Sequence, residues 1–230
     1  MQSLGLIVSL LATVVVSTFG APVPTNEELL SKLITAATAV DRLNLLNDTD
    51  FVFDFFHPQP AAVSSSGEDG TVVLAKRDTF PALVGSGLAM AVGMVGPCGL
   101  NTPHTHPRSA EFNLAVNGTF QVGMLEENGA RLVMNTLNPG QATLFPRGAI
   151  HFEQNLGCEP VLFVAAFADE DPGVSSLTNF FDVPAAVAEA SLDISSTAFQ
   201  KIAGEIPKNI VFGVEECLTR CGLKVSATSI

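Results

Sequence analysis

The amino-acid sequence predicts an all-β protein, a single sandwich or barrel with a helix before it and a helical region after it. Between residues 71 and 167, short apolar segments repeatedly end at turn signals such as Asn117-Gly118. Within this region Phe120, Val122 and Met124 alternate with polar or small residues, which is the period of a half-buried strand. The sequence contains no internal repeat, so these strands are expected to form one β domain.

The segments on either side of the β region have helical patterns. Thr25 and Glu28 form a capping-box sequence, and apolar residues then recur at helical spacing as far as Val40. This pattern predicts one amino-terminal helix outside the main core. Residues 57–70 are rich in Pro, Ser and Gly and are expected to form a loop. Three short helices are expected after the β region, over residues 183–191, 196–205 and 214–222.

The first twenty residues are predicted to be a secretory signal. They carry no charge, and the apolar segment from Leu4 to Val16 is shorter than the roughly 20 residues of a membrane span. Thr18 and Gly20 are small residues of the kind that precede a cleavage site; a buried strand or an anchor helix is the alternative. We therefore expect a secreted, extracellular protein. Its predicted parts are a signal peptide over 1–20, a helix-and-loop extension over 21–70, a β-barrel over 71–181 and a helical region over 182–230.

The surface chemistry excludes several classes of partner. A chain with a net charge of −12 repels phosphate backbones and anionic lipids, so we expect neither a nucleic acid nor a membrane as partner. A small anionic substrate would need local positive charge, which a bound metal cation can supply. Asn47 and Asn117 begin glycosylation sequons, which permit a sugar without requiring one.

The four cysteines predict two disulfides in a secreted chain, and three pairings are possible. Cys217 and Cys221 are separated by three residues with no second close pair nearby, which is unlike the spacing of zinc ligands. We favour a bridge between these two cysteines and a second bridge between Cys98 and Cys158.

Three of the four histidines lie in two short segments that also contain a glutamate. His104 and His106 are two residues apart, so on a strand both side chains leave the same face. Glu111 lies five residues beyond His106, and an unbroken strand would send it to the opposite face. Pro107 disfavours an unbroken strand, and a turn or bulge there would bring Glu111 back. With His151, which begins a later strand, these residues are expected to converge on a metal.

The ligand types indicate which metal such a site would hold. Imidazole and carboxylate together suit a first-row transition metal such as manganese or iron. Four protein ligands leave two positions of an octahedron open for water, dioxygen or a chelating substrate. A structural zinc site would be closed and usually rich in thiolates. The alternative is that these histidines are packed or solvated, as we expect for His57 in the loop.

The two histidine segments resemble the two sequence motifs of the cupins. The first motif, G-x5-H-x-H-x4-E-x6-G, is matched by His104, His106, Glu111 and Gly118, with Cys98 in place of its first glycine. The second motif, G-x5-P-x-G-x2-H-x3-N, is matched at all its positions by Gly140, Pro146, Gly148, His151 and Asn155. The resemblance runs over about residues 88–181. A single barrel behind a secretory signal is similar to germins and to the germin-like spherulins of slime moulds and fungi.

This resemblance implies a cupin β-barrel with a carboxyl-terminal helical region and dimers built into larger rings. It implies that the cofactor is Mn(II), held by His104, His106, Glu111 and His151. The family's known activities are oxalate oxidation and superoxide dismutation, and some members have no assigned chemistry. In the cupin barrel the strand that ends near Cys98 runs antiparallel to the strand that starts near Glu159, which supports the Cys98–Cys158 pairing.

Two positions bear on the substrate. Asn101 matches an asparagine that can hold a substrate carboxylate in oxalate-oxidising germins, so the resemblance implies substrate binding there. A second such asparagine, ten residues earlier, is replaced by Ala91, and the loss of one amide should weaken oxalate binding. Glu170 could donate a proton, as a lid glutamate does in oxalate decarboxylases, but we expect a solvated loop acid.

We therefore expect a secreted manganese cupin, a homo-oligomer with redox activity on a small molecule. Superoxide is the first choice of substrate and oxalate the second. The competing hypothesis is a non-enzymatic coat, storage or stress protein whose metal only rigidifies the barrel. A Ser-His-Asp hydrolase is the weaker reading, because its histidine would have to come from the metal motifs.

Overall fold

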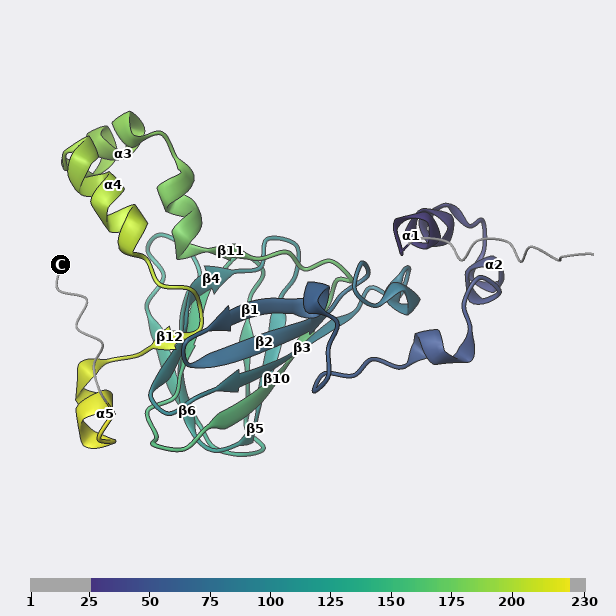
Figure 1. Cartoon of the computed structure of the whole chain (residues 1–230), viewed down its shortest axis with the longest axis horizontal. Helices are drawn as coiled ribbons and strands as arrows, with labels where there is room; N and C mark the ends of the chain where they lie inside the picture. The colour runs from purple at the N-terminus through teal and green to yellow at the C-terminus, as the bar shows by residue number, and fades with distance from the viewer. Residues whose placement is uncertain (1–25, 224–230) are drawn as a thin grey trace, which may run out of the picture.

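The computed structural model describes residues 26–223, and it confirms the predicted all-β fold as two antiparallel sheets (Figure 1). In order across the first sheet lie β1 (Val63–Gly67), β2 (Gly70–Ala75), β3 (Ala89–Val95), β10 (Val161–Phe167), β5 (Glu111–Asn117) and β8 (Ala142–Phe145). Across the second lie β11 (Ser175–Ser176), β4 (Gly99–Thr105), β9 (Ile150–Gln154), β6 (Phe120–Leu125) and β7 (Val133–Leu137), with β12 (Val211–Phe212) paired to β4. The predicted signal peptide of residues 1–20 lies outside the described residues.

The core forms between the two sheets because inward-facing apolar residues alternate along the strands. On β6, Phe120 and Val122 are each 2% exposed, and the partly buried Met124 packs against the same cluster, so the predicted alternation is confirmed. On β10, Phe163 packs against Gly93 of β3, where a Cβ atom would lie 2.2 Å from its ring. Only a glycine leaves room for this ring.

The amino-terminal region lies to one side of the barrel, as predicted, but the prediction of one continuous helix is wrong (Figure 1). The chain forms α1 (Asn26–Thr35) and α2 (Ala39–Leu43). The break occurs because Thr38 caps α2. Its side chain accepts the backbone N–H of Asp41 at 3.1 Å, and the Asp41 carboxylate accepts the backbone N–H of Thr38 at 3.1 Å. Thr25, the first residue of the predicted capping box, lies outside the described residues.

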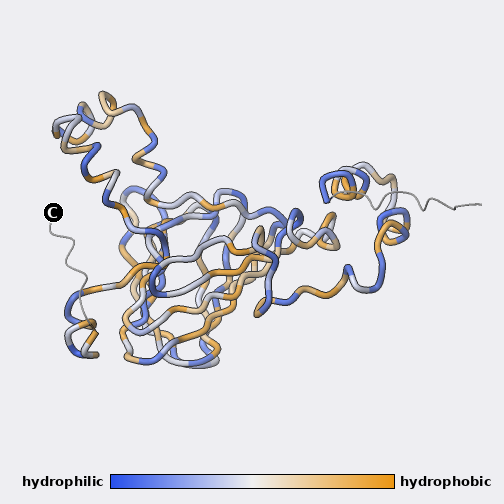
Figure 2. Tube along the Cα trace, in the orientation of Figure 1, coloured by the Kyte–Doolittle hydropathy of each residue, from blue (hydrophilic) through white to orange (hydrophobic). Residues whose placement is uncertain are grey.

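Two short 3-10 turns, η1 (Asp48–Phe51) and η2 (Pro60–Ala62), connect this region to the barrel, and a third, η3 (Pro81–Leu83), lies between β2 and β3. The ring of Phe53 lies 5.4 Å from the ring of Phe80, next to η3. Along this region orange and blue segments alternate in Figure 2, and Ile34, Val40 and Phe56 are all more than half exposed.

The sheets use more of the chain than residues 71–181. Strand β1 lies in the predicted loop, where alternate residues of Val63–Gly67 are partly buried against β2 across a turn at Glu68-Asp69. The loop prediction is therefore wrong over its second half, because a serine-rich strand at a sheet edge has the composition of a loop. Strand β12 likewise returns from the carboxyl-terminal region to β4. The division into domains otherwise stays a prediction.

The predicted carboxyl-terminal helices are confirmed as α3 (Ala185–Leu192), α4 (Ser196–Glu205) and α5 (Glu215–Arg220), after a turn η4 (Leu177–Asp182). Helices α3 and α4 form a hairpin beside the barrel, and α5 lies apart from them near β12 (Figure 1). No helix within residues 26–223 is long and apolar enough to span a membrane.

The predicted disulfide pairing is wrong, although all four cysteines are bridged. The bridges join Cys98 to Cys217 and Cys158 to Cys221. Strands β3 and β10 are antiparallel as expected, so Cys98 and Cys158 do lie at the same end of the barrel. However, Cys217 and Cys221 are one turn apart around α5, so both sulfurs face the barrel and each bonds to a different barrel cysteine.

Candidate metal centre

The four predicted ligands come from both sheets. His104 lies on β4 directly opposite His151 on β9, and His106 follows the end of β4. Glu111 is the first residue of β5 in the other sheet. The bend predicted at Pro107 is therefore a crossover between sheets, which removes the parity problem of the five-residue spacing.

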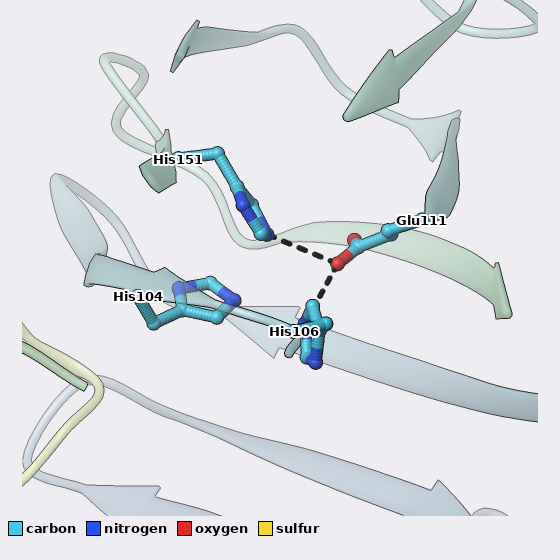
Figure 3. Close-up of side chains that lie close together, drawn as sticks. All are labelled: His104, His106, Glu111 and His151. Atoms are coloured by element: carbon cyan, nitrogen blue, oxygen red, sulfur yellow. Dashed lines mark hydrogen bonds and ion pairs between the residues drawn. The ribbon is translucent and has the colours of Figure 1, made fainter. Parts of the chain in front are cut away.

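The side chains of these residues converge in the barrel interior (Figure 3). One ligand atom from each lies within 4.8 Å of the others. The Glu111 Oε2 atom is 3.0 Å from His106 Nε2 and 3.1 Å from His151 Nε2. Glu111 and His151 are 2% and 1% exposed, and His104 and His106 are 9% and 7% exposed. The structure therefore brings the four residues together out of bulk solvent.

Backbone carbonyls orient all three imidazoles. The Nδ1 atom of His104 lies 2.9 Å from the Thr102 carbonyl, and that of His151 lies 2.9 Å from the Ala149 carbonyl. The Nδ1 atom of His106 lies 2.5 Å from the Gly173 carbonyl. A carbonyl only accepts hydrogen bonds, so each Nδ1 carries the proton and each Nε2 offers its lone pair to the centre.

The electrostatics favour neutral imidazole beside a charged carboxylate. Burial, reinforced by the neighbouring His151, lowers the pKa of His104 to about 3. Burial alone would raise the pKa of Glu111, but its interactions with His106 and His151 hold it well below its ordinary value. These are the protonation states that metal ligands require.

This arrangement fits a metal ion. Two Nε2 lone pairs point at the same carboxylate oxygen, an arrangement that is repulsive unless a proton or a cation lies among them. A cation satisfies all four groups at once, and imidazole with carboxylate is the donor set of manganese and iron sites.

The backbone at Cys98 shows why the first motif begins with glycine. Its φ is 63°, in the left-handed region that favours glycine.

A second layer of polar side chains, which the sequence reasoning missed, supports Glu111. Asn113 Nδ2 donates to Glu111 Oε1 at 2.9 Å and to Glu153 Oε1 at 3.1 Å. Burial and the nearby charge of Glu111 raise the pKa of Glu153 well above its ordinary value. The missed signal was strand periodicity: Asn113 and Glu153 each lie two residues beyond a ligand and so share its face.

Asn101, the predicted substrate-binding residue, lies in a chain of hydrogen bonds with a fixed direction. The backbone N–H of Thr102 donates to Asn209 Oδ1 at 2.8 Å, so Asn209 turns its Nδ2 to Asn101 Oδ1, at 2.5 Å. Asn101 Nδ2 then donates to Glu153 Oε2 at 2.8 Å. A backbone donor at one end and a carboxylate at the other set both amide orientations. One hydrogen on Asn101 Nδ2 remains for a ligand.

A cavity of about 190 Å³ lies beside the ligands, and His104, His106, Glu111 and Asn101 line part of it. A larger groove of about 880 Å³ lies between the barrel and α4. Ser64, Ser65, Thr102, Ser176 and Asn209 line both spaces. The groove therefore lies directly beside the cavity that the metal ligands line.

The remaining predicted residues lie elsewhere. Glu170 does not line the cavity, and it is not the solvated acid we expected, because Oε2 accepts the backbone N–H groups of Gly85 and Gly87. The side chain of His57 is 87% exposed, as predicted. Asn47 and Asn117 are both exposed, and their glycosylation stays a prediction.

Comparison with known proteins decides the family. Residues 53–200, more than half of the chain, match the cupin family. Spherulin-1B of Physarum polycephalum is 45% identical over 204 residues, which cover 88% of this chain and 82% of that protein. The chain is a cupin of the germin and spherulin type. A germin-like protein of Mesembryanthemum crystallinum is 34% identical to this cupin over 138 residues, 58% of either protein.

Solved structures place the fold of this cupin among oxalate-processing proteins. A recombinant oxalate oxidase in complex with glycolate has a TM-score of 0.61 and 22% identity, over 70% of this chain and 82% of that one. Lactobacillus farciminis oxalate decarboxylase in its formate complex has a TM-score of 0.55 and 24% identity, over 60% of this chain and 41% of that one. At these identities the likeness concerns the fold, and the predicted cupin barrel is confirmed.

Proposed function

We propose that this cupin is a secreted, manganese-binding oxidoreductase whose substrate is superoxide. The observation that carries the proposal is the convergence of three Nε2 atoms and one carboxylate beside an accessible cavity. The donor set favours manganese or iron over metals that prefer thiolates. Two disulfides within the described residues support an oxidising, extracellular location.

A bound manganese ion would supply one-electron chemistry, by which two superoxide ions and two protons give dioxygen and hydrogen peroxide. His104, His106, His151 and Glu111 would hold the ion. The three backbone carbonyls would keep the imidazoles in one tautomer, and Asn113 would keep Glu111 aligned. The cavity would admit superoxide and the protons that it consumes from solvent.

Oxalate is the second candidate substrate. The free N–H of Asn101 on the cavity wall favours it, because an amide can hold a carboxylate. Ala91 on the opposite side of the cavity offers no hydrogen bond, so oxalate would be held by fewer partners than in a site with two amides.

A purely structural role is the alternative from another class. The ligands come from both sheets, so a bound metal would cross-link the barrel whether or not it reacted. In a coat, storage or stress protein, the metal would serve only to stabilise the barrel through this cross-link.

The first experiment is to measure the metal content of protein secreted by its own host and purified without chelators or added metal. We expect about one manganese per chain, and rapid consumption of superoxide by that material. Zinc, or no metal, would contradict the redox proposal. Manganese without activity on superoxide or oxalate would favour the structural role.

A further inference from the structure

One wall of the cavity beside the ligands is apolar. It is formed by the first sheet, which contributes inward-facing residues from β2, β3 and β10. These residues are Val72, Leu74, Ala91, Phe163, Ala165 and Phe167. A polar group of a ligand placed against this wall would lose its hydrogen bonds to water and gain none in return.

The other wall is polar but carries no cation among the described residues. Asn101, Asn209 and four hydroxyl-bearing residues line it, and neither a lysine nor an arginine is among them. Glu153, which lies behind Asn101, is a second acidic group. A bound metal would therefore be the one source of positive charge for a ligand in this cavity.

The charge of the loaded site follows by addition. Metal-bound histidines are neutral and Glu153 does not line the cavity, so a divalent ion and the Glu111 carboxylate give the cavity lining a net charge of about +1. One negative charge on the ligand neutralises this site. A second negative charge would be buried without a partner, which is strongly unfavourable in a cavity screened from water.

We propose that the cavity takes a small organic monoanion, a 2-hydroxy or 2-oxo monocarboxylate with a short hydrocarbon body. The inference rests on the proposed metal site and assigns to that site an organic ligand in addition to the superoxide proposed above. The oxygen-rich head binds at the metal and accepts the free N–H of Asn101. The hydrocarbon body lies on the apolar wall. A cavity of about 190 Å³ has room for such a body, since an apolar cavity of about 150 Å³ can hold benzene.

The test compares three probes on the full chain loaded with Mn(II): oxalate, glycolate and 2-hydroxy-3-methylbutanoate. Affinity is measured by calorimetry, and contact with the metal by the Mn(II) electron paramagnetic resonance spectrum. We expect 2-hydroxy-3-methylbutanoate to bind at least about tenfold more tightly than glycolate, because it buries three more carbon atoms. Oxalate should bind more weakly than the branched acid.

The substitution Ala91→Asn adds an amide to the apolar wall and should make the cavity prefer oxalate over the branched acid. We expect affinity for the branched acid to fall about tenfold and affinity for oxalate to rise about tenfold. Ala166→Asn is the matched control, because Ala166 lies on β10 next to Ala165 and faces the other side of the sheet. The control should leave both affinities unchanged.

The outcomes separate this inference from the proposed function. A protein that binds manganese but prefers oxalate, or does not distinguish the three probes, would overturn the inference and leave the metal site intact. A protein that binds no manganese would overturn both. Unchanged affinities in a folded Ala91→Asn variant would also overturn it, and the melting temperature establishes whether that variant is folded.

Discussion

The two ends of β4 are joined to the rest of the molecule by different chemistry. At one end His104 and His106 meet Glu111 and His151 through ligand atoms that need a cation between them. At the other end Cys98 is bonded covalently to α5, with the second bridge beside it. The comparison teaches that the histidine end depends on what it binds, whereas the cysteine end is closed once oxidised. Each end can be perturbed separately.

Substitution of the carboxylate ligand at the histidine end should have the largest effect on metal binding. Glu111→Gln removes the only anion among the four ligands, so we expect metal affinity to fall at least about 100-fold and superoxide consumption to be lost with it. Metal content after dialysis and the melting temperature with and without manganese measure the effect. Glu126→Gln, an exposed position on the outside of the barrel, is the matched control. A Glu111→Gln variant that retains its metal would contradict the assignment.

Removal of a disulfide at the cysteine end should lower stability without loss of the metal. Removing a bonded pair with Cys158→Ser and Cys221→Ser should lower the free energy of unfolding by about 2–4 kcal/mol. Denaturant unfolding measures this change, and metal content should stay the same. Cys98→Ser with Cys158→Ser is the control, since it also removes two cysteines but breaks both bridges and should cost more. Equal losses from the two variants would argue against the observed pairing.

A buried carboxylate at the cysteine end makes stability depend on pH. Asp69 is 9% exposed and lies against Gly96 and Gly99, and burial raises its pKa from 3.8 to about 6. The protonated form is the one the fold accommodates, so Asp69 makes the protein less stable as pH rises from about 4 to about 6.

Asp69→Asn removes this dependence. We expect the variant to be more stable than the wild type above pH 6, by about 1–3 kcal/mol, and equally stable near pH 4. Unfolding at a series of pH values measures the difference. A variant that is destabilised equally at every pH would show that the carboxylate has a hydrogen-bonding role instead.

The smallest effect is expected for Asn209, which contacts β4 between its two ends at Asn101. Asn209→Ala leaves Asn101 without its donor, so its amide should lose its fixed orientation. We expect ligand affinity at the manganese site to fall about fivefold and stability by about 1 kcal/mol. Asn179→Ala, which removes an exposed side chain bonded to Ser175, is the control. An unchanged ligand affinity would show that Asn209 does not contribute to ligand binding.

Much of the centre could be predicted because its ligands are near one another in sequence or in matched motifs. His104 and His106 share a strand face by simple periodicity, and Pro107 indicated the bend before Glu111. The same periodicity would have identified Asn113 and Glu153. Asn209 could not be found in this way, because it lies 108 residues from Asn101 and reaches it only through the packing of the last segment on β4.

The amino-acid sequence by itself determined most strand positions between residues 88 and 167, the helix positions after the barrel and the four converging ligands, because each rests on local periodicity or a short motif. Only the tertiary structure decided the disulfide pairing, the start of the first sheet at β1 and the apolar wall of the cavity. These features depend on which distant surfaces meet. Contacts of that kind are set by packing across the whole chain, and no local pattern encodes them.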